Sequence, residues 1–385
     1  MSDRPVTIFI SAGEVSGDMH AAGLIEALRR QLRDVRIVGV GGPEMARAGC
    51  EPAVKGLDLT AQASMLTGPL TRLGYYRRAI RSLQNSIAQI RPDVHVPVDS
   101  PALNWHLAAT AKQVGAKVAY YVAPQLWAWA PWRIHKLARL TDHVACILPF
   151  EQDWLRERHV KASYVGHPLF DSLPDRPENP PDLLDAWSHG TWQVALLAGS
   201  RPSEITKHVK ALATAAEAIK KRWPASVCTF AAGNEQSSEM ILKRLGGRAP
   251  EGVEIVTSQT SSVLRSSHFA IAVSGTVTLQ AAYFGVPMVV LYRVGRLPYS
   301  LLGRWLIRTP RLSLVNVLAG RKLVPELMPW HGSIKQLNEM TIEVMDDVGY
   351  LAATRKELTD LADTLRAPGS ASAADNVAKI VLDLL

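Results

Sequence analysis

Cysteine is scarce in this sequence, and long apolar runs are absent. The 385 residues include only 3 cysteines, far apart and without C-x-x-C spacing, which argues against a disulfide framework and a zinc site. No stretch reaches the roughly 18 uninterrupted apolar residues of a membrane-spanning helix. The amino terminus lacks the basic start and apolar run of a signal peptide. We therefore expect a cytoplasmic protein, either dissolved or lying on a membrane surface.

Several catalytic patterns are missing as well. The sequence has no Walker loop, no G-x-G-x-x-G fingerprint, no G-x-S-x-G elbow, no H-E-x-x-H motif and no D-x-D pair. These absences argue against a P-loop nucleotide hydrolase, a dinucleotide-binding enzyme of the usual kind and a serine hydrolase. Histidines and cysteines do not cluster, so we expect no catalytic metal and no other cofactor.

Positive charge is in excess and locally concentrated. Lysine and arginine total 43 against 35 acidic residues, a formal net charge of +8, which favours an anionic partner. Residues 293–322 hold seven basic residues and no acidic one, interleaved with leucine and tryptophan. This mixture suits anionic membrane lipid. The expected contacts are Arg304, Trp305, Arg308 and Arg311. A solvated basic face is the alternative; nucleic acid is not expected, because its binding motifs are absent.

Short apolar runs alternate with segments of helical period along the whole chain. The runs are residues 6–10, 36–40, 94–98, 117–122, 143–147, 194–198, 226–231, 253–256, 269–273 and 287–291. Such alternation predicts α/β architecture with two doubly wound, Rossmann-like parallel sheets. A proline-rich break at 174–190 separates the two sets. We expect domains at 1–180 and 181–350, facing a central cleft, and helices at 351–385 that pack on either domain.

The first predicted strand leads into a glycine-containing turn and a helix. Residues 11–20 read SAGEVSGDMH, so polar side chains and backbone N–H groups gather at a helix start. Glu14 is a candidate catalytic carboxylate, and Ser16, Asp18 and His20 are candidate cleft residues. The alternative is purely structural, with the glycines as turn residues and Asp18 as a helix cap.

Asp99 follows another predicted strand and is the leading candidate for a general base. Its position at the carboxyl end of a central strand is where a base facing a cleft would stand. The competing interpretation is a helix N-cap, because Pro101 follows two residues later.

Two further turns of small polar residues occur in the second half. Gly199, Ser200 and Arg201 follow the strand at 194–198, and Ser274, Gly275 and Thr276 follow the strand at 269–273. Backbone donors, hydroxyls and a guanidinium at a helix start are suited to a diphosphate. Each segment is also compatible with an ordinary tight turn, but the pair favours nucleotide binding.

Together these motifs resemble the lipid-A-disaccharide synthases, a family of GT-B type inverting glycosyltransferases. The matching segments follow in order over nearly the whole chain: 11–20, 39–49, 98–104, 124–136, 148–151, 165–171, 199–205, 274–290 and 313–326. The resemblance implies transfer of 2,3-diacylglucosamine from its UDP donor to 2,3-diacylglucosamine 1-phosphate. The products would be the β-1,6-linked disaccharide 1-phosphate and UDP.

The resemblance also implies roles for particular residues. The UDP donor would be bound by Gly199, Ser200, Arg201, Ser274, Gly275, Thr276 and Gln280. Asp99, or else Glu14, would act as base, and Asn316 would be a further cleft residue. The acyl chains imply a peripheral protein on the cytoplasmic face of the inner membrane, in contact with anionic lipid; a homodimer is left open.

Two positions depart from the family pattern. Gln280 stands where a carboxylate commonly binds the ribose hydroxyls, and Ala102 stands where the family usually has aspartate. They leave two alternatives open. One is another UDP-N-acetylglucosamine-type transferase or epimerase, and the other is a catalytically inactive paralogue.

Overall fold

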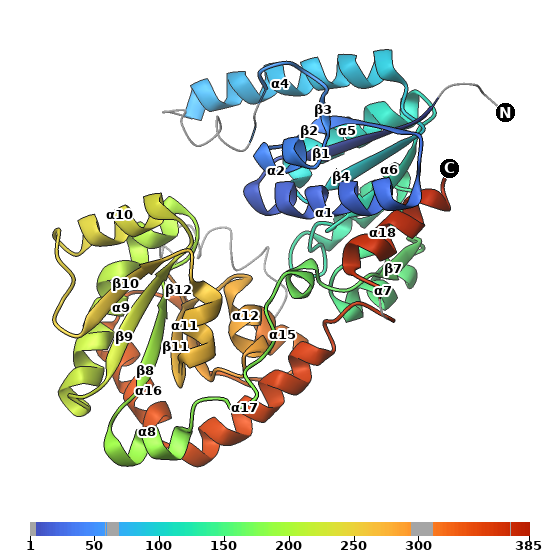
Figure 1. Ribbon diagram of the computed structural model, residues 1–385. Coiled ribbons are helices and arrows are strands. Elements are labelled where there is room, and N and C mark those ends of the chain that lie inside the picture. The colour runs from blue at the N-terminus through green and yellow to red at the C-terminus, as the bar shows by residue number, and fades with distance from the viewer. Residues whose placement is uncertain (1–4, 58, 60–68, 294–310, 370) are drawn as a thin grey trace. The chain divides into compact units, whose positions relative to one another are not determined.

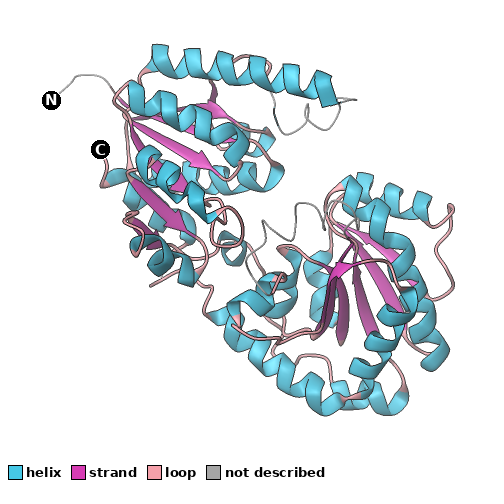
Figure 2. Ribbon diagram, turned by 180° about the vertical axis from the view of Figure 1, so that it is seen from behind, coloured by secondary structure: helices cyan, strands magenta, loops and turns pink. Residues whose placement is uncertain are grey.

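The chain folds into two compact units, each with its own parallel sheet between layers of helices (Figures 1 and 2). The computed structural model describes all residues except 1–4, 58, 60–68, 294–310 and 370. Unit 1 comprises Met1–Asp171 together with Leu365–Leu385, and unit 2 comprises Ser172–Thr364.

In unit 1 the described strands form one seven-stranded parallel sheet in the order β3-β2-β1-β4-β5-β6-β7. The strands are β1 (Val6–Ala12), β2 (Val35–Val40), β3 (Glu51–Pro52), β4 (Val94–Val98), β5 (Lys117–Tyr121), β6 (His143–Cys146) and β7 (Ala162–Tyr164). The α-helices are α1 (Val15–Gln31), α2 (Pro43–Arg47), α4 (Pro69–Ile90), α5 (Pro101–Gln113), α6 (Ile134–Leu140), α7 (Pro149–Arg156) and α18 (Ala373–Leu382).

Both faces of this sheet are covered, which explains why its strands read as apolar runs. Ile8 and Ile10 pack under α1 and α18, whereas Phe9 points to the opposite face, against α4, α5 and α6. The alternation follows from the two-residue period of a strand. The sheet is therefore packed between two hydrophobic cores, one on each face.

In unit 2 the described strands form a six-stranded parallel sheet in the order β10-β9-β8-β11-β12-β13. The strands are β8 (Gln193–Leu197), β9 (Val227–Ala232), β10 (Val253–Thr257), β11 (Phe269–Val273), β12 (Met288–Arg293) and β13 (Glu326–Trp330). The α-helices are α8 (Leu183–His189), α9 (Pro202–Arg222), α10 (Glu235–Arg244), α11 (Thr260–Ser266), α12 (Val277–Tyr283), α15 (Leu314–Leu318), α16 (Ile334–Asp346) and α17 (Val348–Asp363).

All ten predicted strands are present, and the prediction of two doubly wound parallel sheets is confirmed. The strand order adds what the sequence does not show. In each sheet the winding direction reverses once, between β1 and β4 in unit 1 and between β8 and β11 in unit 2. Ligands of open α/β sheets bind at the carboxyl ends of the strands at this reversal. The four predicted turns follow these four strands.

The division of the chain differs from the expected limits of 180 and 350. Unit 1 gives way to unit 2 after Asp171, and the chain returns to unit 1 at Leu365. The helices expected at 351–385 divide between the two units, because their apolar faces are buried in different cores. Leu351 of α17 is buried in the core of unit 2, and Val377 and Val381 of α18 are buried in the core under α1.

Candidate functional site

Asp99 stands at the carboxyl end of β4 in a strained turn. Asp99 and Ser100 both have positive φ, 49° and 44°, which is uncommon for residues other than glycine. The Asp99 N–H donates to the Tyr121 carbonyl (3.0 Å), and the Asp99 carbonyl accepts from Asn104 Nδ2 (2.7 Å) and from the Tyr120 hydroxyl (2.8 Å). The backbone is thus fixed from inside the fold, and the residue is only half-buried. The N-cap position of α5 belongs to Ser100 instead.

A buried polar network lies beneath this turn. The Ser11 hydroxyl donates to Asn104 Oδ1 (2.6 Å), so it accepts from His95 Nε2 (2.9 Å). His95 is therefore the Nε2–H tautomer, and its Nδ1 has no partner among the described residues. Burial lowers the pKa of His95 to about 3, which keeps the ring neutral. None of these three residues was predicted as a site residue, because each lies within a mainly apolar strand or helix.

Residues of the β1–α1 turn divide into exposed and structural groups. Glu14 and Ser16 are exposed, and Glu14 occupies the N-cap position of α1 without a side-chain capping bond. His20 is half-buried, and burial lowers its pKa to about 4.

Asp18 has a structural position rather than the expected place in a cleft. It is buried, and its carboxylate accepts from the N–H groups of Gly42 (2.7 Å), Glu44 (3.0 Å) and Met45 (3.1 Å). These are the unpaired donors at the start of α2, which need an acceptor because the helix cannot supply one. Asp18 thus ties α1 to α2.

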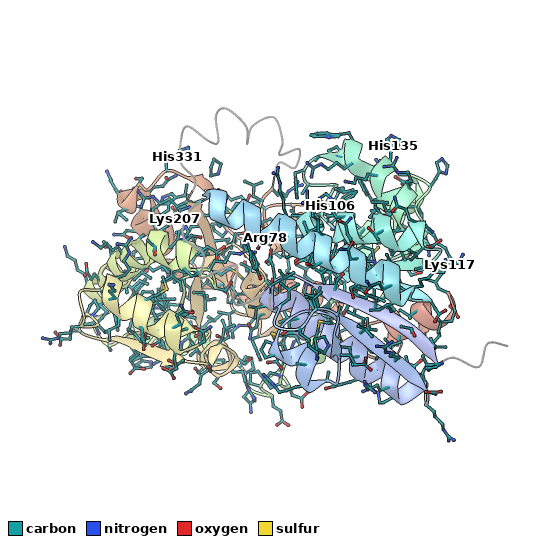
Figure 3. All side chains as sticks on the ribbon, turned by 90° about the horizontal axis from the view of Figure 1, so that it is seen from above. Arg78, His106, Lys117, His135, Lys207 and His331 are labelled. Atoms are coloured by element: carbon teal, nitrogen blue, oxygen red, sulfur yellow. The ribbon has the colours of Figure 1, made fainter. Side chains whose placement is uncertain are left out.

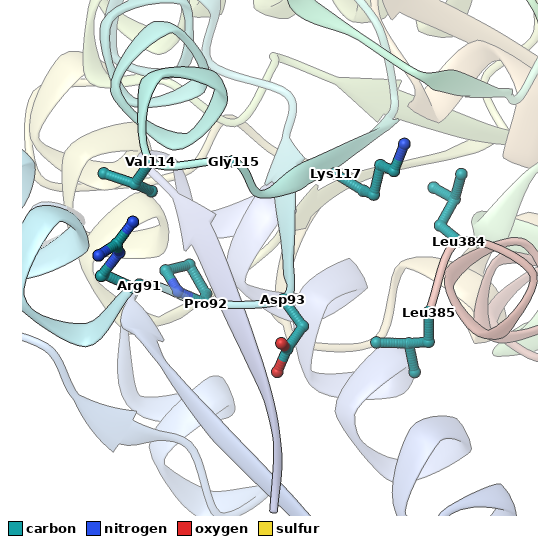
Figure 4. Close-up of a pocket in the computed structure, with 8 residues that line it drawn as sticks. All are labelled: Arg91, Pro92, Asp93, Val114, Gly115, Lys117, Leu384 and Leu385. Carbon is teal, nitrogen blue, oxygen red and sulfur yellow. The ribbon is translucent and has the colours of Figure 1, made fainter. Parts of the chain in front are cut away.

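Two cavities of unit 1 lie at opposite ends of the central strands. The larger, about 830 Å³, is lined by Glu14, Ser100 and residues of α4 and α5. Figure 3 labels Arg78 and His106 on these two adjacent helices. The other cavity, about 480 Å³, lies at the amino ends of β4 and β5, where Asp93 and Lys117 border it (Figure 4). It contains none of the predicted site residues.

In unit 2 the turn after β8 is filled by a residue of its own helix. Glu204 is buried, and its Oε2 accepts from the N–H groups of Ser200 (3.1 Å) and Arg201 (3.2 Å). Gly199 has φ +95°, and a Cβ placed there would lie 2.5 Å from Glu204 Oε2. The backbone donors that were predicted to cradle a diphosphate are therefore occupied. The side chains of Ser200 and Arg201 are exposed, and the Arg201 guanidinium pairs with Glu204 Oε1 (3.4 Å).

The turn after β11 is open. Gly275 and Thr276 are exposed, and a Cβ on Gly275 would meet no described atom within 4 Å. The protein's own packing therefore does not require glycine here, whereas close approach of a ligand would. Gln280, one turn into α12, is half-buried and donates from Nε2 to the Ser261 hydroxyl (2.9 Å), which orients its amide.

Asn316 is not exposed in a cleft. It is fully buried, and its Nδ2 donates to the Val324 carbonyl (2.9 Å) and to Glu326 Oε2 (2.9 Å). Its Oδ1 accepts from the N–H groups of Leu323 (2.8 Å) and Val324 (2.9 Å). Every polar atom of the amide is engaged, so the residue holds the segment between α15 and β13 in place.

The predicted membrane contacts lie mostly outside the described residues. Arg304, Trp305 and Arg308 belong to the undescribed 294–310, and Arg311 is half-buried. In the part of the chain that is described, no helix is long and apolar enough to cross a bilayer. The same part contains no group of three or more His, Cys, Asp or Glu side chains arranged to hold a metal ion.

Glu151 and His208 are two buried polar groups outside the predicted set. Glu151, at the start of α7, accepts from Trp127 Nε1 (2.9 Å) and from the Leu148 N–H (3.1 Å), and burial raises its pKa to about 7. His208 of α9 accepts from the Arg293 N–H at Nε2 (2.8 Å) and so donates from Nδ1 to the Glu204 carbonyl (2.8 Å). Both positions depend on contacts between distant segments.

Comparison with known proteins covers nearly the whole chain. A family model described as lipid-A-disaccharide synthetase matches residues 8–381. The lipid-A-disaccharide synthase of Myxococcus xanthus (strain DK1622) is 34% identical over 389 residues, covering 99% of this chain and 98% of that protein. That of Geobacter sulfurreducens is 33% identical over 383 residues, covering 98% and 97%.

Solved structures share the fold at low sequence identity. The S. aureus MnaA–UDP co-structure has a TM-score of 0.63 at 14% identity and covers 99% of this chain and 98% of that one. A putative UDP-N-acetylglucosamine 2-epimerase from Listeria monocytogenes gives 0.61 at 13%, covering 99% and 95%. The glycotransferase of kitacinnamycin gives 0.53 at 16%, with both chains covered in full. At such identities the likeness establishes the GT-B type of fold and no more.

Proposed function

This chain belongs to the lipid-A-disaccharide synthase family and is a UDP-dependent hexosyltransferase, and we propose that it joins two acylated glucosamines. The donor is UDP-2,3-diacylglucosamine and the acceptor is 2,3-diacylglucosamine 1-phosphate. The products are the β-1,6-linked disaccharide 1-phosphate and UDP. The observation that carries the proposal is Asp99, whose backbone is held by hydrogen bonds in a strained turn at the winding reversal of the first sheet.

Asp99 acts as the general base in this proposal. Its carboxylate takes the proton of the acceptor 6-hydroxyl as that oxygen attacks the anomeric carbon of the donor, so the configuration inverts. The bond from the anomeric carbon to the diphosphate breaks, and its electron pair leaves with UDP. Asn104 and Tyr120 serve as positioning residues, because they fix the Asp99 carbonyl and thereby the direction of the carboxylate.

Unit 2 binds the leaving nucleotide. The Arg201 guanidinium and Ser200 hydroxyl are exposed, and the open turn at Ser274, Gly275 and Thr276 allows phosphate oxygens to approach the backbone. These donors stabilise the charge that develops on the diphosphate, with no metal ion needed. Gln280, oriented by Ser261, offers its amide to the ribose hydroxyls.

Mass spectrometry of the products tests the proposal. Purified protein incubated with the two acylated substrates should yield equal amounts of disaccharide 1-phosphate and UDP. Product that forms from donor alone, or none at saturating substrates, would contradict it.

Two other functions have specific observations in their favour. Solved relatives of the same fold include UDP-N-acetylglucosamine 2-epimerases, and conversion of acyl-free UDP-N-acetylglucosamine would establish an epimerase or a related transferase. Gln280 and Ala102 favour an inactive paralogue, for which UDP binding without turnover would be the result.

We place the protein on the cytoplasmic face of the inner membrane, bound to anionic lipid. The support is the run of seven basic and no acidic residues at 293–322. Neutralising Arg304, Arg308 and Arg311 together should weaken binding to phosphatidylglycerol vesicles far more than binding of UDP. Equal losses in both would argue against a membrane role.

A further inference from the structure

The cavity between α4 and α5 combines an apolar interior with a basic rim. Its volume is about 830 Å³, within the range of small-molecule sites. Leu59 and Leu103 are buried at its wall, and Ile80 and Pro101 are half-buried. These side chains surround a space that suits a hydrocarbon chain, because burying apolar surface there removes it from water.

One wall carries a hydroxyl without a partner. Ser100 is 8% exposed, and its Oγ makes no hydrogen bond with any described group. A Cβ on residue 13 would lie 3.0 Å from this oxygen, so glycine at position 13 avoids crowding the hydroxyl. Burying a hydroxyl without a partner costs free energy, and such a group in a cavity wall is expected to bond a ligand. A ligand carbonyl or hydroxyl would satisfy it.

The rim is almost entirely cationic or neutral. Arg77 and Arg81 are exposed and lie one turn apart on α4, where Gln84 continues the same face. His106 faces them from α5, and Glu14 is the one acidic residue among the described lining residues. Guanidinium groups at this spacing match the oxygens of a phosphate.

We propose that this cavity is the binding site for the phosphorylated acyl sugar, with an acyl chain in the apolar interior, a polar group on the Ser100 hydroxyl and the phosphate on Arg77 and Arg81. The inference rests on the proposed function, because the acceptor is the substrate that carries an acyl chain and a phosphomonoester. It also explains the orphaned hydroxyl beside Asp99.

The first test measures how strongly the protein prefers a phosphorylated acceptor. The Kd of the acceptor and of its dephosphorylated form is measured by calorimetry in detergent for wild type, Arg77→Gln, Arg81→Gln and the double variant. Each substitution should weaken binding of the phosphorylated form at least about tenfold and leave the dephosphorylated form nearly unchanged. Arg78→Gln is the matched control, an exposed arginine of the same helix that does not line the cavity.

The second test uses Ser100→Ala. Since the Ser100 Oγ bonds no described group, its removal should leave thermal stability unchanged while the acceptor Kd rises about tenfold. A loss of stability with unchanged acceptor binding would overturn the role assigned to the hydroxyl.

The outcomes also separate the sources of phosphate. If the arginine variants lose binding to phosphatidylglycerol vesicles but keep acceptor affinity, the rim binds membrane phospholipid and the proposal is wrong. Unchanged affinity for both would overturn it as well. If wild type forms no disaccharide but binds the acceptor, and the variants lose that binding, the proposed transfer fails while this site stands.

Discussion

The turns after β4 and after β8 look alike in sequence but differ in what they leave for a ligand. Both connect a buried strand to a helix that starts with proline, at Pro101 and at Pro202. After β8, Glu204 reaches back and bonds the N–H groups of its own turn. After β4, Asn104 of the following helix and two residues of the neighbouring strand β5 hold the backbone of Asp99. The Ser100 hydroxyl has no partner in the described part of the chain.

The difference shows that the polar groups of such a turn can be bonded by its own helix or can be left without a partner, open to a ligand. A glutamate three residues after the N-cap forms a capping box and satisfies the local donors. Helix α9 has that glutamate, and α5 has Leu103 at the corresponding position. The turn after β8 is therefore held by its own helix, whereas the turn after β4 also depends on bonds to the neighbouring strand β5.

The largest expected effect is that of Asp99→Asn. Removing the base should lower kcat by about 10²–10⁴-fold. Thermal unfolding should change far less than kcat, because the bonds to Asn104, Tyr120 and Tyr121 use the backbone of Asp99 and survive the substitution. Glu14→Gln is the control; if it abolishes turnover while Asp99→Asn retains it, Glu14 is the base.

Glu204→Ala should act mainly on stability. It leaves the N–H groups of Ser200 and Arg201 without their acceptor, at a cost of about 3 kcal/mol in the free energy of unfolding. Urea titration measures the loss, and Glu204→Gln, which keeps an acceptor oxygen, should recover part of it. Unchanged stability with a loss of UDP affinity would instead make Glu204 a ligand group.

A pair of glycine substitutions compares the filled turn with the open turn of unit 2. Gly199→Ala forces a methyl group against Glu204 at a positive φ and should cost about 2 kcal/mol of stability. Gly275→Ala meets no described atom and should leave stability unchanged while UDP affinity falls. Both are measured by unfolding and by UDP calorimetry, and the reverse pattern would show that the second turn is the one packed from within.

The smallest effect concerns pH and the network under Asp99. His95 has a pKa lowered from 6.5 to about 3, so between these values the unfolded chain binds a proton that the folded protein does not. Stability therefore falls as pH drops below 6.5, by about 1.4 kcal/mol at pH 5.5 from this residue. His95→Gln keeps a donor for Ser11 and cannot titrate, so it should remove that increment between pH 7.5 and 5.5.

An equal loss of stability in wild type and His95→Gln over this range would show that the ring titrates in the folded state. In that case the hydrogen bond from Nε2 to Ser11 would not require a neutral histidine.

Much of the fold follows from local patterns. The ten strands were predicted because apolar, β-branched runs of this length are buried on both faces of a parallel sheet. Asp99 was singled out because a carboxylate directly follows such a run. The two-residue strand β3, the short strand β7 and the proline-containing strand β13 were missed, since none of them carries a clear apolar run. The spacing from Arg201 to Glu204 is that of a capping box, but the same turn has the composition of a diphosphate site, which is the role that the sequence predicts.

Other assignments could not come from the sequence. Asp18 and Asn316 are residue types common in binding sites, yet partners 24–27 and 7–10 residues away engage their polar atoms. Ser11, His95 and Asn104 are separated by as many as 93 residues. Their contact exists only because β1 and β4 are neighbours in the sheet.

The sequence by itself determined the elements of this protein, its family and the carboxylate at the end of β4, because periodicity and motif spacing are local properties. Only the tertiary structure decided which polar groups face a ligand. That outcome depends on strand order and on which hydrogen bonds are already made inside the fold. A buried donor or acceptor that has a partner stabilises the fold. One without a partner, such as the Ser100 hydroxyl, can form a hydrogen bond with a ligand.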